Sequence, residues 1–206
     1  METLTQEIPK SLIYEEFGGR IYYRRGYRQV LLGLKTEDEI MGSSFLQGLI
    51  VQAVVHYLKL TLPKKRFWVP TNEVGLHVKL RENYAGDILI CEKSKSPNPW
   101  LEYYMPVPPK FIVEVDINVD ATNYDADPPT GGEMDYILEK SAQLLDFGVE
   151  GIAWILTKGR RVVLIKSHRT VEIFQWHETV PLFDDYSFCL QQILEDEDIL
   201  PPSVAP

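Results

Sequence analysis

The chain has 206 residues, a formal net charge of −9 and an isoelectric point near 5.0. This length allows one domain with a substantial core, and 45% hydrophobic with 25% charged residues is ordinary for a soluble globular protein. The acidic balance argues against a broad basic surface for nucleic acid. Basic residues do cluster at 20–28, 64–66 and 158–166, where they could form a small basic groove or merely solvated faces.

The sequence shows no apolar run that we expect to cross a membrane, and its Met-Glu-Thr start lacks the pattern of a secretion signal. A cytoplasmic protein without membrane contact is therefore expected. Cys91 and Cys189 are isolated inside apolar segments, so they are predicted to be small core residues and not a disulfide or metal framework.

Residues 1–11 are polar and unpatterned, and we expect a flexible N-terminus there. Aromatic and charged residues then alternate over 12–27 around Gly18-Gly19, which predicts a short hairpin. Its tyrosines could stack on nucleic-acid bases, or they could close the side of the core with their hydroxyls at its wet edge.

Two helix starts follow, each with the spacing of a capping box. Thr36 precedes Glu39 and opens a short helix, and Ser44 precedes Gln47 and opens a longer one that Pro63 ends. Apolar residues of the longer segment recur at helical spacing, which predicts one broad buried face.

Strand patterns begin after residue 66, at 67–69 and 74–80. A turn-like segment at 82–86 leads to Asp87 and the apolar run 88–91. An acid at the mouth of a buried strand is either a turn former or a ligand held at the edge of the sheet. From this segment alone, the turn is the favoured interpretation.

Residues 108–118 are predicted to form a central strand, because they are mostly β-branched or aromatic after two prolines. Alternation places Glu114 and Asp116 on the same face. Two buried carboxylates repel each other and lose hydration, so a divalent metal or a lysine between them would relieve the cost. An edge strand with a wet outer face is the alternative, because acids cost nothing there.

Residues 133–147 carry a helical stripe that Gly148 ends. Lys140 falls at the margin of this stripe, so its ammonium could reach over the sheet beneath. In the other interpretation, its stem covers apolar surface while its head stays in water. The preceding loop, 119–132, is long enough to be functional or mobile.

The last third of the chain is predicted to hold a β-meander and a short helix, followed by a disordered acidic and proline-rich tail at 195–206. The meander strands are placed at 152–156, 161–165 and 171–176, and the helix at 188–194. Residues 12–194 therefore form a single predicted domain, of mixed α/β class.

Asp87, Glu114 and Lys140 are an ordered set that suits phosphodiester hydrolysis. Carboxylates can hold Mg²⁺, which polarises the phosphate and lowers the pKa of a bound water, and a cation can stabilise the developing charge. Each residue is weak evidence by itself, and the set together means more.

The chain resembles the PD-(D/E)XK nuclease superfamily, and specifically a bacterial restriction-endonuclease-like family formerly known as a domain of unknown function. The resemblance runs from about Tyr14 to Trp176 and is strongest in the segments 85–90, 108–115 and 139–155. It implies a restriction-endonuclease-like core, with a central mixed β-sheet flanked by helices, an N-terminal hairpin and a C-terminal meander.

The resemblance also implies a site. Asp87, Glu114 and the Val115 carbonyl would hold Mg²⁺ or Mn²⁺, and Lys140 would stand for a lysine that has moved from the strand to the helix. Three positions depart from the family pattern: Asp116 replaces the strand lysine, Gly86 replaces the proline before the first acid, and Gln47 stands where many members carry a histidine. Asp116 could add a metal ligand or mark a degenerate site, and Gln47 is an accessory candidate.

Three functions are consistent with these residues. The favoured one is a Mg²⁺-dependent endonuclease that hydrolyses DNA in the cytoplasm, and nucleases of this type that cut both strands often work as homodimers. The second is a catalytically lapsed domain that binds nucleic acid or a protein partner. The third is a purely structural protein in which Lys140 pairs with Glu114, a pair that by itself would add little stability.

Overall fold

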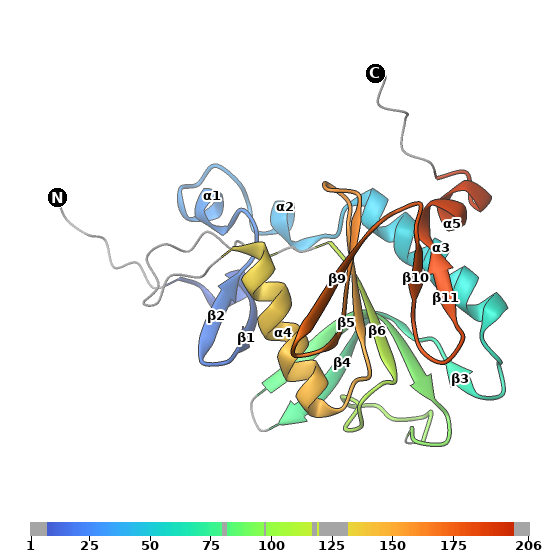
Figure 1. The fold of residues 1–206 in the computed structure, drawn as a ribbon. Coiled ribbons are helices and arrows are strands. Elements are labelled where there is room, and N and C mark those ends of the chain that lie inside the picture. The colour runs from blue at the N-terminus through green and yellow to red at the C-terminus, as the bar shows by residue number, and fades with distance from the viewer. Residues whose placement is uncertain (1–7, 80–81, 97, 117–118, 120–131, 200–206) are drawn as a thin grey trace. The chain divides into compact units, whose positions relative to one another are not determined.

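The computed structural model describes residues 8–79, 82–96, 98–116, 119 and 132–199 (Figure 1). The chain divides into two compact units, which are described separately. Unit 1 comprises Met1–Ser43 and Ile117–Lys140, and unit 2 comprises Ser44–Asp116 and Ser141–Pro206. The prediction of a single domain over 12–194 stays a prediction. Most of the predicted disordered tail and of the loop after the central strand lies outside the described residues.

Unit 1 contains the hairpin that the N-terminal pattern predicts. A 3₁₀ turn, η1 (Lys10–Leu12), leads into β1 (Ile13–Phe17), which pairs antiparallel with β2 (Arg20–Tyr23). Gly18 and Gly19 close the hairpin with φ values of 60° and 73°, and this left-handed backbone favours glycine at both positions.

Two short helices, α1 (Tyr27–Leu31) and α2 (Asp38–Met41), follow the hairpin in unit 1. Leu12, Tyr27 and Ile40 form a small core there, and Tyr23 stacks on Tyr27 with ring centroids 4.7 Å apart. Tyr27 therefore serves the core, as one of the two interpretations of the tyrosines expects.

Unit 2 is built on a mixed seven-stranded sheet (Figure 1). Its order is β3-β5-β6-β7-β8-β9, with β4 also paired to β5. Only the β6–β7 pair is parallel, and the other pairs are antiparallel, which confirms the predicted mixed sheet and meander. The strands are β3 (Phe67–Trp68), β4 (Thr71–Lys79), β5 (Glu82–Glu92), β6 (Phe111–Val115), β7 (Ile152–Leu156), β8 (Arg161–Ser167) and β9 (Thr170–Gln175).

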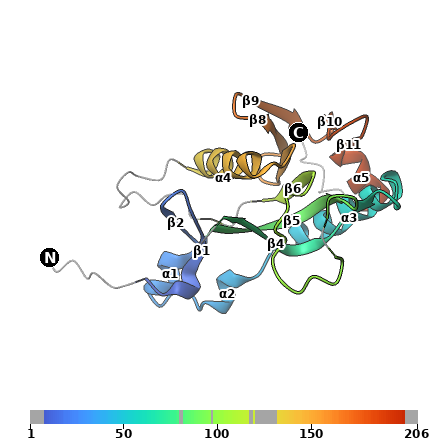
Figure 2. The ribbon, with the colours of Figure 1, turned by 90° about the horizontal axis from the view of Figure 1, so that it is seen from below.

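Strand β6 lies between β5 and β7, and all five of its residues are buried. The edge-strand alternative is therefore wrong. Phe111, Val113 and Val115 belong to the core that α3 (Phe45–Thr61) and α5 (Leu190–Asp196) cover, and Figure 2 shows these two helices side by side. Each fully buried side chain of this size stabilises the fold by about 1.5–3 kcal/mol.

The opposite face of the sheet meets the second half of α4 (Glu133–Phe147), the part of this helix that belongs to unit 2. Ser141 is fully buried, and its Oγ accepts a hydrogen bond of 3.0 Å from Trp154 Nε1 on β7. Both faces of β6 and β7 are therefore covered, as a parallel strand pair with a helical crossover requires.

Helix α3 begins where its sequence predicts. Ser44 Oγ accepts a hydrogen bond of 3.1 Å from the Gln47 N–H, which satisfies one of the free donors of the first turn. The buried face of the helix consists of Ile50, Ala53, Val54, Val55 and Leu58.

Within the described part of the chain, one helical segment, Asp38–Thr61, could cross a membrane by length and composition alone, with a hydropathy of 1.2 in its most apolar window. The prediction that no such segment exists is therefore wrong on composition. The segment is weak evidence for a membrane span, because the core helix of a soluble protein passes the same test. Its larger part, α3, packs five side chains into the core of unit 2. The cytoplasmic location stays a prediction.

Two local predictions differ from the structure. Residues 82–86 are not a turn but the first part of the eleven-residue strand β5, so Asp87 lies within a strand and its favoured interpretation as a turn former is wrong. A small hairpin, β10 (Thr179–Pro181) with β11 (Ser187–Cys189), was not predicted, because strands of three residues carry no recognisable alternation. Helix α5 consequently begins at Leu190 and not at Phe188.

Both cysteines are free thiols. Cys91 is buried in β5, and this burial raises the pKa of its thiol to about 12. The prediction that the cysteines form no disulfide is confirmed.

Candidate functional site

Asp87 and Glu114 lie on neighbouring strands of the unit 2 sheet. Strands β5 and β6 are antiparallel, and the two acids come directly after Ile88 and Val113, the last pair of their ladder. The Asp87 N–H donates a hydrogen bond to Glu114 Oε2, so the two residues are neighbours in space. Sequence positions 27 residues apart thus meet in the sheet.

Each carboxylate accepts a hydrogen bond from the neighbouring strand. Asp87 Oδ2 accepts from the Val115 N–H at 2.8 Å, and Glu114 Oε2 accepts from the Asp87 N–H at 3.4 Å. Glu114 is only 5% exposed, whereas Asp87 is half-buried. The backbone N–H groups fix both carboxylates against the sheet and hold them close together.

The backbone of Val115 completes this arrangement. Odd-numbered residues of β6 direct their N–H groups toward β5, whereas Ile112 and Asp116 donate theirs to the β7 side, to Gly151 and Ile155. The N–H and C=O of one strand residue point to the same side, so the Val115 carbonyl also faces β5.

The donor set suits a hard divalent cation. Two carboxylates and a carbonyl oxygen are ligands that Mg²⁺ accepts, since Mg²⁺ commonly keeps several waters and takes only one or two carboxylates from the protein. Over the described part of the chain, no three side chains of Asp, Glu, His or Cys converge as a metal-binding group. A metal at this place would therefore depend on backbone carbonyl and water ligands for most of its coordination.

Asp116 does not continue the pattern of β6. The strand ends at Val115, and Asp116 adopts a left-handed backbone with a φ of 59°. Its carboxylate accepts hydrogen bonds from the Thr157 N–H at 2.8 Å and from Thr157 Oγ1 at 2.7 Å. The alternation that placed Asp116 on the face of Glu114 therefore does not extend to it, because the strand ends one residue earlier. Both of its oxygens bind Thr157, so we leave it out of the proposed metal site.

Lys140 belongs to unit 1, where it is the centre of a charged cluster. Its Nζ lies 3.0 Å from Glu15 Oε1 on β1 and 3.5 Å from the Tyr136 hydroxyl one helical turn away. The Tyr136 hydroxyl in turn donates a hydrogen bond of 2.6 Å to Glu15 Oε2. Lys140 is only 2% exposed, so the interpretation in which its head stays in water is wrong.

Sequence analysis missed Glu15 and Tyr136. Tyr136 could have been found, because its spacing of four residues from Lys140 places both on one face of a helix. Glu15 gives no local signal, because it is separated from Lys140 by 125 residues. Lys140 and the two sheet carboxylates belong to different units, so their predicted meeting around one ion stays a prediction.

Gln47, the accessory candidate, lies in the first turn of α3 and is half-buried. Its described role is structural, since its N–H completes the cap with Ser44.

Searches of family models and of curated proteins found no match to this chain. Among solved structures, the fold is similar to that of a putative nuclease belonging to DUF820 from Anabaena variabilis ATCC 29413. The match has a TM-score of 0.59 and 12% sequence identity, and it covers 88% of this chain and 89% of the other. At this identity the likeness concerns the fold. The chain therefore has a mixed α/β fold of the kind found in that nuclease-like protein.

Proposed function

We propose that the chain is a metal-dependent endonuclease that hydrolyses DNA phosphodiester bonds, with Asp87 and Glu114 as its metal ligands. The observation that supports this most is that both acids lie on neighbouring strands, where each accepts a hydrogen bond from strand backbone, Asp87 from the Val115 N–H and Glu114 from the Asp87 N–H.

The residues of the chain would each have a distinct task. Asp87, Glu114 and the Val115 carbonyl would hold Mg²⁺ or Mn²⁺, which supplies a bound water of lowered pKa and an electrophile for the phosphate oxygen. The two carboxylates accept hydrogen bonds from rigid strand backbone, so their oxygens are positioned before any ligand binds. Such preorganisation is the usual source of electrostatic stabilisation of a transition state.

The family resemblance gives Lys140 the role of the cation that stabilises the attacking hydroxide or the developing charge. In unit 1 its ammonium is held by Glu15 and Tyr136, which restrict its position. Glu15 would then orient Lys140 and not act on the phosphate. DNA as substrate and a homodimer that cuts both strands are parts of this proposal.

The test is cleavage of supercoiled plasmid in Mg²⁺, in Mn²⁺ and in EDTA. We expect metal-dependent nicking that falls at least about a hundredfold in Asp87→Asn, Glu114→Gln and Lys140→Met, since each removes a charge from the reacting centre. Glu172→Gln, an exposed acid on β9, is the matched control and should cleave normally. Nicking that resists EDTA, or that survives in Glu114→Gln, would contradict the proposed site.

A catalytically lapsed domain that binds nucleic acid or a protein partner is the second candidate, and the departure at Asp116 favours it. The Asp116 carboxylate, which stands in place of the strand lysine of the family, accepts hydrogen bonds from Thr157. This position of the strand therefore supplies no cation. Calorimetric titration with Mg²⁺ separates the two candidates. Metal binding that is lost in Glu114→Gln, without any nicking by the wild type, would support the lapsed domain.

A further inference from the structure

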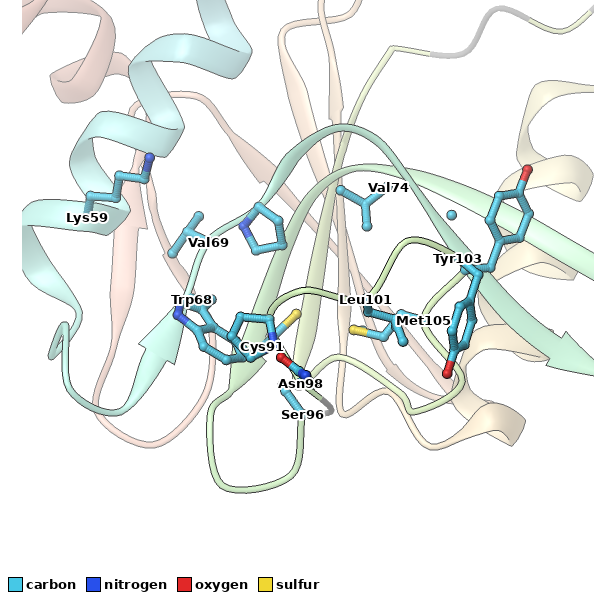
Figure 3. A pocket seen from close by; sticks show the side chains of 14 residues that line it. Lys59, Trp68, Val69, Val74, Cys91, Ser96, Asn98, Leu101, Tyr103 and Met105 are labelled. Atoms are coloured by element: carbon cyan, nitrogen blue, oxygen red, sulfur yellow. The ribbon is translucent and has the colours of Figure 1, made fainter.

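Unit 2 contains a second feature that the proposed metal site does not use, a cavity of about 520 Å³ between the strands β3 to β5 and the loop that follows β5. Figure 3 shows that its lining comes from the end of α3 (Lys59), from the β3 region (Trp68 and Val69) and from the loop (Asn98 and Tyr103). This size lies within the range of about 300–1,000 Å³ that is typical of pockets for organic ligands.

The aromatic residues at this cavity are unusually exposed. Tyr103 is 72% exposed and Tyr104 is 52% exposed, although both line the cavity. Trp68 is half-buried and lies at the other end of the cavity from Tyr103 (Figure 3). Exposed aromatic side chains that gather in one place mark a binding site more often than a random surface does. Much of the surface of the Tyr103 and Tyr104 side chains is therefore open to solvent and accessible to a ligand.

Gly75 on β4 leaves room for the ring of Tyr104, which forms an aromatic wall of the cavity together with Tyr103. A Cβ atom at Gly75 would lie 2.5 Å from Cδ1 and 2.8 Å from Cγ of Tyr104, so only glycine allows the ring to lie directly against the strand. The Tyr104 ring is consequently supported by backbone, and the exposed Tyr103 ring stands next to it in the chain.

Positive charge surrounds the same cavity. Lys59 lines it, Lys93 Nζ lies 5.3 Å from the centre of the Trp68 ring, and the same ammonium donates a hydrogen bond to the Lys64 carbonyl. In the described residues, none of the lysines at 59, 64, 65 and 93 forms an ion pair with a carboxylate. This local excess of positive charge contrasts with the net charge of −9 of the whole chain.

We infer that this cavity binds an unpaired stretch of a single-stranded nucleic acid, whose bases stack on Tyr103 and Tyr104 at one end while Lys59 and Lys93 contact phosphates at the other end (Figure 3). Aromatic rings beside a basic rim are the combination by which proteins hold single strands, because every base has a face to stack and every nucleotide has a charge to neutralise. A role for this cavity in binding the substrate of the enzyme rests on the proposed endonuclease function. The binding of single strands by itself does not rest on it.

The experiment measures the fluorescence anisotropy of a labelled twelve-nucleotide oligo(dT) with the full chain in EDTA, so that no cleavage intervenes. Tyr103→Ala should weaken binding by about fivefold to a hundredfold, as expected for one lost stacking contact, and Tyr103→Phe should bind like the wild type. Lys59→Gln should make the slope of the logarithm of the binding constant against the logarithm of salt concentration less negative by about 0.7. This is the value for one phosphate contact on a single strand.

The matched controls are Phe45→Ala and Lys158→Gln, an exposed aromatic residue and an exposed lysine that do not line the cavity. Both should bind as the wild type does. A duplex of the same sequence should bind more weakly, because its bases are already stacked. Equal binding by Tyr103→Ala and the wild type, or tighter binding of the duplex, would overturn the inference.

The two proposals can fail separately. Plasmid nicking that needs Glu114, together with oligonucleotide binding that ignores Tyr103, overturns the base-stacking cavity and leaves the nuclease standing. Oligonucleotide binding that depends on Tyr103, without metal-dependent nicking, supports the cavity and overturns the nuclease.

Discussion

Glu114 in unit 2 and Glu15 in unit 1 are both largely buried acids, but the groups that bind them within their units differ. Glu114 is 5% exposed and accepts a backbone N–H from Asp87, beside a second carboxylate. The side chain of Glu15 is 10% exposed and receives the ammonium of Lys140 and the hydroxyl of Tyr136. A backbone N–H fixes the position of a carboxylate and adds no full charge, whereas an ammonium neutralises it.

Under the proposed function the two clusters have different tasks. The pairing of Glu15 with a lysine and a phenol stabilises unit 1, and the carboxylates of unit 2 bind a divalent cation. Variants of the first cluster should therefore change stability without metal, and variants of the second should change the response to metal.

The largest effect on stability is expected from Lys140→Met. Removing the ammonium leaves Glu15 buried beside Tyr136 without its cation, and breaking a buried pair in this way costs about 3–5 kcal/mol. Urea unfolding should show this loss, and the double variant Lys140→Met with Glu15→Gln should recover most of it. Lys158→Met, at an exposed turn position, should change stability by less than about 0.5 kcal/mol. If Lys140→Met leaves the free energy of unfolding unchanged, the burial of Glu15 does not require this ammonium.

Glu114→Gln should change the response to metal. At a Mg²⁺ concentration of about 100 times the dissociation constant, binding to the native state alone stabilises a protein by about 2.7 kcal/mol. The wild type should gain this amount relative to EDTA, and Glu114→Gln should gain almost none. The measurement is urea unfolding with and without Mg²⁺, and an equal gain in both proteins would place the metal elsewhere.

Asp116 sharpens the comparison, because it is an acid next to the proposed site that serves the fold. Asp116→Ala removes two hydrogen bonds to Thr157. It also places alanine in a left-handed backbone conformation, with a φ of 59°, which alanine rarely adopts. We therefore expect the free energy of unfolding to fall by about 2 kcal/mol. Asp116→Asn tolerates this backbone and can accept one of the bonds, so its loss should be smaller. If Asp116→Asn abolishes nicking while it stays folded, Asp116 is a metal ligand after all.

The sequence predicted those features whose signals are local. The Ser44 cap, the hairpin at Gly18-Gly19 and the apolar alternation of β6 each depend on spacings of a few residues, and each is present. The grouping of Asp87 with Glu114 came from their chemistry and from a family resemblance, and the two residues lie on neighbouring strands. Strand length was harder to predict, because β5 continues through a segment whose Asn, Ala and Gly residues favour turns.

Features that depend on distant partners were not predictable from pattern. No spacing rule indicates that Glu15 meets Lys140, or that the carboxylate of Asp116 turns to Thr157 across 41 residues. The left-handed backbone of Asp116 is also invisible to alternation, which assumes that a strand continues until a proline or glycine stops it. The sequence therefore indicates acids on neighbouring strands, whereas the contacts around them depend on the fold.

The smallest effect concerns an acid at the other extreme of exposure, Glu39 in unit 1. Its Oε2 accepts a hydrogen bond of 2.7 Å from the Thr36 N–H and one of 3.1 Å from Thr36 Oγ1, and these bonds lower the pKa of the Glu39 carboxyl. A lowered pKa in the folded state means that these two hydrogen bonds stabilise the fold above the ordinary carboxyl pKa. The contribution is lost as the pH falls through the lowered value.

An NMR titration of the Glu39 side chain should give a pKa below the ordinary glutamate value of about 4.3. Thr36→Val should raise the pKa of Glu39, because the hydroxyl bond is removed while the backbone N–H remains. An unchanged value in Thr36→Val would assign the whole shift to the backbone bond.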